Sequence, residues 1–283
     1  EKDRYLNIQQ VKDMVEDLIS EIITQKEVLF SLMDVNSYDD YTFAHSVNVC
    51  LISIIIGISL RYDRIKLTEL GIGALLHDIG KTHVDRQILN KKDILTTEEY
   101  EEIKRHPEYG FNILRAYQDI SLLSSHVAYQ HHERWDGTGY PRGIKGKDIH
   151  EYARIVAAAD VYDALMGDRP YRPPFTVDQA IAEIRQMRGT HLDPRIAGIM
   201  IANIAVYPVG SLIQLSTGDI AIVVKVRKLN PTQPVVRVIF TAGKEKVGTY
   251  HEIDLASLST IRIIHVLGKN EINNISALLK QKN

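Results

Sequence analysis

The sequence lacks the features expected of a disulfide-bonded, membrane-spanning or duplex-DNA-binding protein. Its 283 residues contain one cysteine, Cys50, so an intramolecular disulfide is excluded and a reducing compartment is favoured. The 34 basic and 36 acidic residues give a net charge of −2, which predicts no broad surface for a polyanion. The most apolar stretch, 47–60, is shorter than the roughly 20 residues of a membrane span. We therefore expect a cytoplasmic protein with no DNA partner and no membrane span in this chain.

What the sequence does contain is an ordinary globular composition with a surplus of histidine. Hydrophobic residues make up 45% and charged residues 25%, and the length suits one large or two modest domains. The chain opens on Glu1 without a basic segment followed by an apolar run, so we interpret it as a processed chain or a piece of a longer one. Eleven histidines are present, nine of them between His45 and His191. Histidine is the commonest metal ligand and a general acid or base, so this crowding indicates a functional site.

Hydrophobic periodicity divides the chain into four parts. Residues 1–36 predict a helix and linker, 37–206 a helical domain, 207–268 a small β-domain and 269–283 a polar tail. The β-domain is indicated by four short β-branched segments separated by turn signals, LIQLS, IAIVVKV, VVRVIF and TIRIIHV. We thus predict a mainly α protein with a small C-terminal β-domain. Helix starts are predicted at Thr176, by a T-x-x-Q capping box, and at Asp193 before Pro194.

The N-terminal segment carries an apolar stripe with heptad spacing. From Ile8 to Leu32 the apolar positions repeat at intervals of three and four, interrupted only by Gln25. Such a helix has one apolar face. That face either packs on the domain behind it or forms a dimer that transmits a signal from an upstream sensor, and the sequence leaves both interpretations open.

Several short motifs could converge on a metal. His77 and Asp78, in HDIGK at the end of an apolar helix, offer a nitrogen and an anionic oxygen from one turn. Two consecutive histidines, His131 and His132, stand beside the Gly-rich stretch DGTGYP, where packing seldom needs two imidazoles. Asp160 lies in the apolar run VAAADV, and an ionised carboxylate there must be paired or must bind a cation.

Two further histidines indicate a metal site only when they are considered together with these motifs. His45 begins the most apolar helix, and His106 precedes Pro107 at a predicted helix start. Taken alone, the first is typical of a buried core histidine and the second of a capping or surface residue.

Together these stretches resemble the HD-GYP family, a branch of the HD phosphohydrolases. The matching segments are YTFAHS, HDIGK, HPEYG, HHERWDGTGYP, AAADVYDAL and RPYR, in the family's order over about 160 residues. The resemblance implies an HD-type helical bundle. It also implies seven metal ligands: His45, His77, Asp78, His106, His131, His132 and Asp160.

The resemblance further implies how the ions are divided. Asp78 would bridge two divalent ions, one held with His45, His77 and Asp160 and the other with the remaining three histidines. Some members bind a third ion through a glutamate four residues before the first histidine, where this chain has Tyr41. A phenol is a poor ligand at neutral pH, so we predict two ions. Imidazole-rich ligation argues against magnesium, and the family favours iron or manganese.

Other residues near these motifs suit an anionic substrate. Lys81 is expected to share a helix face with His77 and to contact a phosphate oxygen or help protonate the leaving group. Arg169 and Arg172 would hold phosphate oxygens, and Tyr140 would line the site within a turning loop. The remaining histidines match no ligand position of the family; they are His83, His126, His150, His191, His251 and His265.

The resemblance implies a bacterial phosphodiesterase that linearises cyclic di-GMP to pGpG through a hydroxide bridging the two ions, with further cleavage to GMP left open. Alternatives are a 3′,3′-cyclic GMP-AMP phosphodiesterase, a non-catalytic receptor for a cyclic dinucleotide, and an HD hydrolase of nucleoside triphosphates or guanosine tetraphosphate. The doubled His131-His132 and the GYP loop disfavour the last. Family members are often joined to sensor domains and can contact diguanylate cyclases, so such partners are expected by resemblance.

Overall fold

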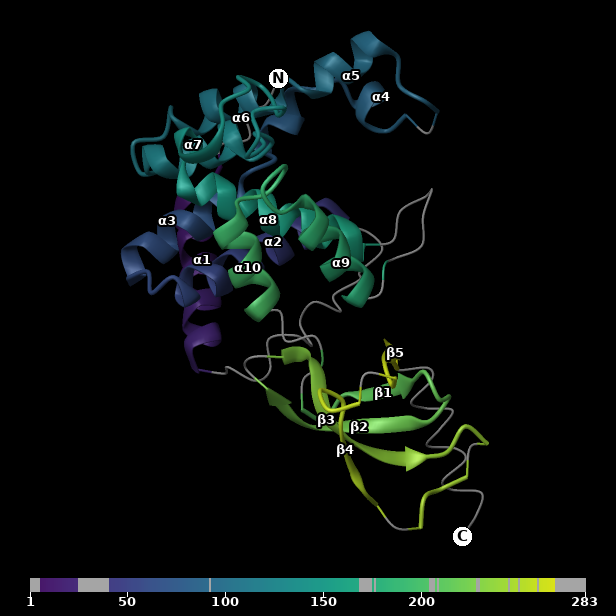
Figure 1. The fold of residues 1–283 in the computed structure, drawn as a ribbon. Coiled ribbons are helices and arrows are strands. Elements are labelled where there is room, and N and C mark those ends of the chain that lie inside the picture. The colour runs from purple at the N-terminus through teal and green to yellow at the C-terminus, as the bar shows by residue number, and fades with distance from the viewer. Residues whose placement is uncertain are drawn as a thin grey trace. The chain divides into compact units, whose positions relative to one another are not determined.

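The computed structural model describes most of the chain, in two compact units. The described residues are 6–24, 41–91, 93–167, 175, 177–203, 207, 209–227, 230–243, 245–248, 250–258 and 260–267. One unit comprises Glu1–Pro173 and Ile181–Ile201, and the other comprises Pro174–Ala180 and Ala202–Asn283. In Figure 1 the helices run from purple to green, and the strands follow in green and yellow.

The first unit is a bundle of helices. Its longer helices are α1 (Ile8–Thr24), α2 (Tyr41–Ser59), α3 (Arg64–Leu75), α6 (His106–Leu114), α7 (Leu122–Gln130), α8 (Glu151–Met166), α9 (Val177–Met187) and α10 (Pro194–Asn203). The first residues of α9 are assigned to the other unit. Shorter turns connect them, namely η2 (Ile79–His83), α4 (Arg86–Leu89), α5 (Thr97–Ile103) and η3 (Gly146–Asp148).

Local sequence signals start these helices. Asp63 caps α3 by accepting from the backbone N–H of Lys66, and Ser121 caps α7. Thr96 and Glu99 form a capping box at α5. The predicted start at Asp193 is confirmed, because its carboxylate accepts from the backbone of Arg195 at 2.7 Å. The predicted capping box at Thr176 lies outside the described residues.

The helix α2 forms the centre of the unit, as its apolar sequence predicts. Val49, Cys50 and Ile54 are fully buried, and α2 packs on both α3 and α8. Burial raises the pKa of the Cys50 thiol to about 12, so this cysteine is an inert core residue. No helix within the described residues is both long and apolar enough to cross a membrane.

The helix α1 packs on the body of the same unit. Ile8, Val15 and Ile22 of the predicted apolar stripe are buried, and so is Ile19, which was not part of it, whereas the predicted Leu18 is only partly buried. The helix α1 packs against α3. A β-carbon at Gly71 would lie 2.5 Å from Cγ1 of Val15, so a glycine is needed where the two helices approach. This contact supports the first of the two interpretations; dimerisation stays a prediction, and residues 25–40 lie outside the described part.

The second unit contains one antiparallel sheet of five described strands. They are β1 (Leu212–Leu215), β2 (Ile220–Arg227), β3 (Asn230–Phe240), β4 (Glu252–Asp254) and β5 (Ile263–Val266), in the order β4-β3-β2-β1-β5. Four of them overlap the predicted segments, although β3 begins at Asn230, five residues before the predicted VVRVIF, and β5 begins three residues after the start of TIRIIHV. The strand β4 was not predicted, because three residues carry no usable alternation. Alternate residues of β2 and β3, such as Ala221, Val223 and Val236, are buried on one face.

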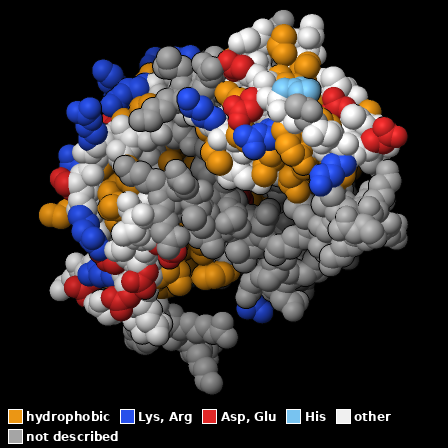
Figure 2. Space-filling view, turned by 90° about the horizontal axis from the view of Figure 1, so that it is seen from below, with side chains coloured by type: hydrophobic (Ala, Val, Ile, Leu, Met, Phe, Trp, Pro, Cys, Tyr) orange, Lys and Arg blue, Asp and Glu red, His pale blue; other side chains and the backbone are white. Residues whose placement is uncertain are grey.

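The predicted fold class, a helical bundle with a small C-terminal β-domain, is confirmed. Figure 2 shows that, on the described part of one face, basic, acidic and hydrophobic side chains are interspersed. This mixture agrees with the near-balance of charges in the sequence.

Candidate metal centre

His77 and Asp78 lie where α3 stops. The helix ends at Leu75, and the chain turns at Leu76 before entering the 3-10 helix η2. His77 is completely buried and Asp78 is 8% exposed. The sharp turn therefore places a carboxylate in the interior of the bundle, where the surrounding side chains must compensate its charge.

A glycine brings a second segment onto this turn. A β-carbon at Gly80 would lie 1.9 Å from the carbonyl oxygen of His106 and 2.5 Å from the amide nitrogen of Gly110. Only glycine permits this approach of η2 to the start of α6. As a result His106 Nε2 lies 3.3 Å from Asp78 Oδ1.

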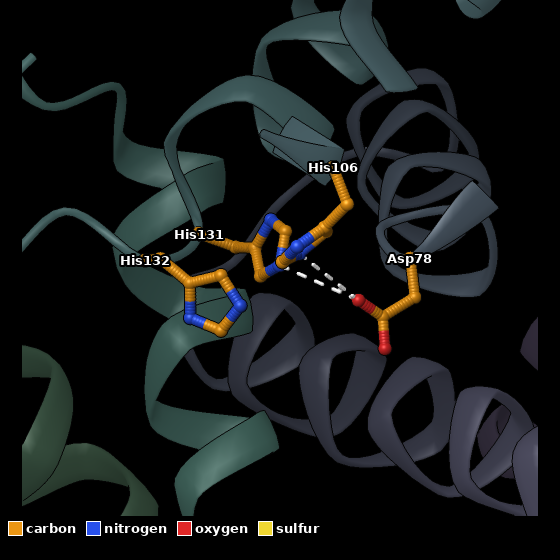
Figure 3. A group of neighbouring side chains, drawn as sticks. All are labelled: Asp78, His106, His131 and His132. Atoms are coloured by element: carbon orange, nitrogen blue, oxygen red, sulfur yellow. Dashed lines mark hydrogen bonds and ion pairs between the residues drawn. The ribbon is translucent and has the colours of Figure 1, made fainter. Parts of the chain in front are cut away.

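The paired histidines come from the end of α7. His131 is the C-cap residue and is 2% exposed; His132 follows it. The Nε2 atom of His131 lies 3.7 Å from Asp78 Oδ1 and 3.3 Å from His106 Nε2. In Figure 3 the rings of His106 and His131 point toward the Asp78 carboxylate, and His132 lies beside them.

The helices α2 and α8 supply the other side of the site. His45, in the second turn of α2, places Nε2 at 3.3 Å from Asp160 Oδ1 and 4.0 Å from Asp78 Oδ2. His77 Nε2 lies 3.4 Å from the same Asp78 oxygen. The carboxylate that the sequence places in an apolar helix is thus paired with an imidazole.

The seven predicted ligands form two groups. Asp78, His106, His131 and His132 have potential ligand atoms within 4.8 Å of one another, and so do His45, His77 and Asp160. The two oxygens of Asp78 face different groups: Oδ1 faces His106 and His131, and Oδ2 faces His77 and His45. One carboxylate therefore links the two groups.

The charges of His45, His77 and Asp160, which form one of the two groups, stabilise one another. Burial alone would lower the pKa of His45, but hydrogen bonds with Asp160 and Asp163 outweigh it and raise the pKa to about 9. Burial also opposes the charged form of His77, yet Asp78 raises its pKa. Burial would raise the pKa of Asp160, but its hydrogen bond with His45 and the charge of His77 lower it.

In the group that contains Asp78, His106, His131 and His132, burial has the largest effect on the pKa values of His106 and His132. Burial, followed by the nearby charge of His131, lowers the pKa of His106 to about 3 and that of His132 well below its usual value. Burial would raise the pKa of Asp78, but the neighbouring imidazoles and Lys81 lower it well below its usual range. Neutral imidazoles and an ionised carboxylate are the forms that bind metals.

Backbone carbonyls orient three of the five imidazoles. The Nδ1 atoms of His77 and His106 lie 2.7 Å from the carbonyl oxygens of Ala74 and Ile103, and His131 Nδ1 lies 3.0 Å from that of Ala128. Each contact favours a proton on Nδ1 and leaves Nε2 free to act as a ligand.

The other two imidazoles are oriented by side chains. His45 Nδ1 lies 2.7 Å from Oδ2 of Asp163. The ring of His132 stacks on that of Tyr140, with centroids 4.7 Å apart and planes inclined by 25°. Tyr140 thus contacts the site, and one face of its ring is covered by His132.

The residues fit a divalent metal ion. Among the described residues, the buried side-chain atoms without a hydrogen-bond partner are Ser53 Oγ, His77 Nε2 and Asp78 Oδ1. Two of these three atoms belong to the cluster and are donor atoms suited to a metal. A buried polar atom without a partner is costly, and a cation would compensate both.

Lys81 contacts the site through Asp78. Because the α-helix ends before His77, the helical spacing that predicted a shared face does not apply; the ammonium lies 2.5 Å from Asp78 Oδ2. Its side chain is 38% exposed, so it also borders solvent. Arg169 and Arg172 lie outside the described residues, as does the side chain of Tyr41.

The GYP loop is held by a residue that sequence analysis did not select. Glu133 is 3% exposed, and its two carboxylate oxygens accept from the backbone N–H groups of Arg142 and Ile144 at 2.9 and 3.1 Å. A β-carbon at Gly139 would lie 2.3 Å from the Arg134 amide nitrogen, so the loop also needs a glycine. The only signal in the sequence was an acidic residue directly after two histidines, and that pattern also fits a metal ligand.

Asp163 and Asn48 were also missed. Asp163 follows Asp160 by three residues and therefore lies on the same helix face, which is a signal that the sequence does contain. Of the unassigned histidines, His150 caps α8 through Nδ1, and the carbonyl of His191 accepts from the Trp135 N–H. Both roles are structural.

The fold and the clustered side chains together define a helical domain of the histidine–aspartate class. The sequence model of the HD domain family matches residues 19–196, and a model described as a KOW domain associated with HD domain matches residues 212–275. The chain therefore belongs to the HD domain family, and its motifs identify it with the HD-GYP branch. HD domains bind divalent metal ions, in agreement with the cluster.

The relatives are consistent with this assignment. The chain is 35% identical over 243 residues to a cyclic di-GMP phosphodiesterase of Pseudomonas aeruginosa, covering 86% of this chain and 58% of the relative. It is 37% identical over 190 residues to a cyclic di-GMP phosphodiesterase of Thermotoga maritima, covering 65% and 52%. A 3′3′-cGAMP-specific phosphodiesterase of Vibrio cholerae is 38% identical over 127 residues, 44% of this chain and 24% of the relative.

The chain spans about half the length of the first two of these relatives. Among solved structures, an HDG"Y"P protein of Bdellovibrio bacteriovorus matches with a TM-score of 0.58 at 24% identity, covering 68% of this chain and 61% of that chain. This likeness shows the shared fold.

Proposed function

We propose that the chain hydrolyses a phosphodiester bond of a cyclic dinucleotide, with cyclic di-GMP as the first candidate. The observation that carries the proposal is the Asp78 carboxylate, whose two oxygens face two separate groups of potential metal ligands. The names of the relatives from Pseudomonas aeruginosa and Thermotoga maritima support the choice of substrate.

Two divalent ions are proposed, with iron or manganese favoured by the five imidazoles. Asp78 would contribute to both; His45, His77 and Asp160 would complete one set, and His106, His131 and His132 the other. When bound, such a pair of ions lowers the pKa of water and stabilises the attacking and leaving oxygens of an in-line displacement.

The charges favour an anionic substrate. Five neutral imidazoles and two carboxylates carry −2 against +4 from two divalent ions, which leaves an excess of about +2 at the site. Lys81 adds a cation at Asp78 Oδ2 and is proposed to contact a phosphate oxygen or the leaving group. Arg169 and Arg172 are proposed as further phosphate contacts, and Tyr140 as a wall of the site.

The test combines metal quantification with a chromatographic assay of cyclic di-GMP. We expect about two equivalents of Mn²⁺ or Fe²⁺ in loaded protein, with linear pGpG as the product, and the same assay measures whether GMP follows. His77→Ala and Asp78→Ala should lose metal and turnover, whereas His83→Ala, outside both groups, should retain them. Loaded protein of verified occupancy that leaves cyclic di-GMP intact would contradict the activity, and persistent binding without turnover would indicate a receptor. One equivalent or none would contradict the dinuclear site.

A second substrate, 3′,3′-cyclic GMP-AMP, is favoured by one specific observation, the relatives of Vibrio cholerae named for its hydrolysis. The chemistry at the phosphate is the same, so selection depends on contacts with the bases. Competition between the two cyclic dinucleotides in one reaction, with kcat/KM measured for each, decides between them.

A further inference from the structure

The group that orients the His45 imidazole differs from those that orient the other proposed histidine ligands. Three imidazoles are held by carbonyls of the preceding helical turn, which every amino acid supplies. His45 is held instead by the side chain of Asp163, whose Oδ2 lies 2.7 Å from Nδ1. This contact joins α2 to α8 and depends on the identity of one residue.

Asp163 is itself fixed by a second donor. Asn48, one turn after His45 on α2, donates from Nδ2 to Asp163 Oδ1 at 2.9 Å. Both carboxylate oxygens are thus engaged by donors from α2, and Asp163 is 9% exposed. The Asp163 carboxylate lies at Nδ1 of the His45 imidazole, while Asp160, three residues earlier, lies at Nε2.

We propose that Asp163, held by Asn48, is a positioning residue that keeps Nε2 of His45 directed toward Asp160 and Asp78. The inference deepens the proposed function, because it rests on the metal groups assigned there. A carboxylate on the second nitrogen of a ligating imidazole fixes its tautomer and raises its basicity, and losing such a partner weakens metal binding by about 10- to 100-fold. The effect should be confined to the ion of His45, His77 and Asp160, since the other group contains no Asp163 contact.

The experiment is a titration of metal-stripped full chain with Mn²⁺, followed by calorimetry and by the electron paramagnetic resonance of bound Mn²⁺. Wild type should bind two ions and show the signal of a coupled pair. Asp163→Leu should retain one ion at wild-type affinity, bind the other about 10- to 100-fold more weakly and show an uncoupled signal. Asp163→Asn, which can still accept from Nδ1, should show a smaller loss.

The control is Asp193→Asn, at a buried carboxylate that caps α10 and pairs with Arg154, outside both metal groups. It should lower thermal stability without changing either Mn²⁺ affinity. A double-mutant cycle of Asp163→Leu with Asn48→Ala should be non-additive, because the two residues act in series.

The inference would be overturned by wild-type affinity for both ions in Asp163→Leu, by equal weakening of both ions, or by a matching loss in the Asp193→Asn control. Wild type that binds fewer than two ions would also overturn it. Two bound ions without hydrolysis would refute only the proposed activity, since every readout here is metal binding.

Discussion

At the scale of single residues, the metal centre is organised by what lies behind each ligand. Carbonyl oxygens support His77, His106 and His131, and a carboxylate supports His45. His132 relies on stacking with an aromatic ring. A substitution at a supporting side chain should therefore alter the orientation of one ligand. The orientation of a histidine that is supported by a carbonyl should change only when the backbone moves.

Tyr140 should affect metal binding through its ring and not through its hydroxyl. The ring stacks on His132 at 4.7 Å, and such a pair contributes roughly 0.5–1.5 kcal/mol beyond its buried area. We expect Tyr140→Phe to bind metal like wild type and Tyr140→Leu to weaken one of the two ions by about threefold to tenfold. Calorimetric titration with Mn²⁺ measures this; equal losses in both variants would contradict a stacking role.

Lys81 should affect turnover more than metal occupancy. It contacts Asp78 Oδ2 but supplies only a cation, which cannot serve as a metal ligand. We expect Lys81→Met to lower kcat by about 100-fold, the usual size of a lost proton donor or charge contact, while two metal equivalents remain. Metal analysis and kinetics on the same sample check this, with Lys81→Arg retaining more activity. Loss of metal in parallel with activity would assign Lys81 a structural role.

At the scale of elements, the site depends on how closely η2 approaches α6. The glycine of the HDIGK motif allows the backbone at Gly80 to lie against the carbonyl of His106, which sets the distance between Asp78 and His106. Sequence patterns place each helix, but this approach is a contact between segments that lie about 26 residues apart in the chain. A single added methyl group at Gly80 is therefore expected to move Asp78 away from His106.

Gly80→Ala should both destabilise the helical unit and weaken metal binding. The added carbon would lie 1.9 Å from a carbonyl oxygen, so backbone must shift, at a cost of about 3 kcal/mol. Chemical denaturation and Mn²⁺ titration measure the two effects. The control is Gly198→Ala in α10, where the nearest atom is 3.8 Å away and a gain of up to about 1 kcal/mol is expected. Wild-type stability in Gly80→Ala would contradict the close approach.

The start of α8 should be sensitive to pH through His150. Its Nδ1 accepts from the backbone N–H of Tyr152 at 3.2 Å, and burial, with the nearby charges of His126 and Arg154, lowers its pKa below the usual 6.5. The unfolded chain therefore takes up this proton first, so stability falls as the pH drops below about 6.5. Protonation would also abolish the cap and place a positive charge at a helix N-terminus.

His150→Asn separates this effect from the other histidines. Asparagine keeps a capping oxygen but does not titrate, so we expect the variant to match wild type at pH 8 and to exceed its stability by about 1 kcal/mol near pH 5. Urea denaturation across this range provides the measurement. An unchanged difference between variant and wild type from pH 8 to 5 would contradict a titrating cap.

At the scale of the whole molecule, the centre connects helices that belong to one unit. The seven proposed ligands come from α2, the turn after α3, α6, the end of α7 and α8, all within the helical unit. A metal that binds only the folded state stabilises that state, by about 2.7 kcal/mol when its concentration is 100 times Kd.

Metal removal should therefore act on one unit alone. We expect a chelator to lower the Tm of the helical unit by several degrees, about 2–4 °C for each kcal/mol, and to leave the transition of the β-unit unchanged. Differential scanning calorimetry with and without EDTA tests this. His77→Ala should already have the lower Tm and should not respond to EDTA; a similar response would place the metal elsewhere.

The sequence alone determined the residue types, their order and the local elements, because helix caps, periodicity and turn residues are short-range signals. These signals predicted a helical domain and, at least in part, four of the five described strands, whereas the set of seven residues that cluster came from the resemblance to the HD-GYP family. Tertiary structure decided which oxygen of Asp78 faces which group, the pairing of Lys81 with that carboxylate, and the support of His45 by Asp163. These relations join segments up to 118 residues apart, and their geometry follows from helix packing and from close approaches such as Gly80 on His106, which local patterns do not encode.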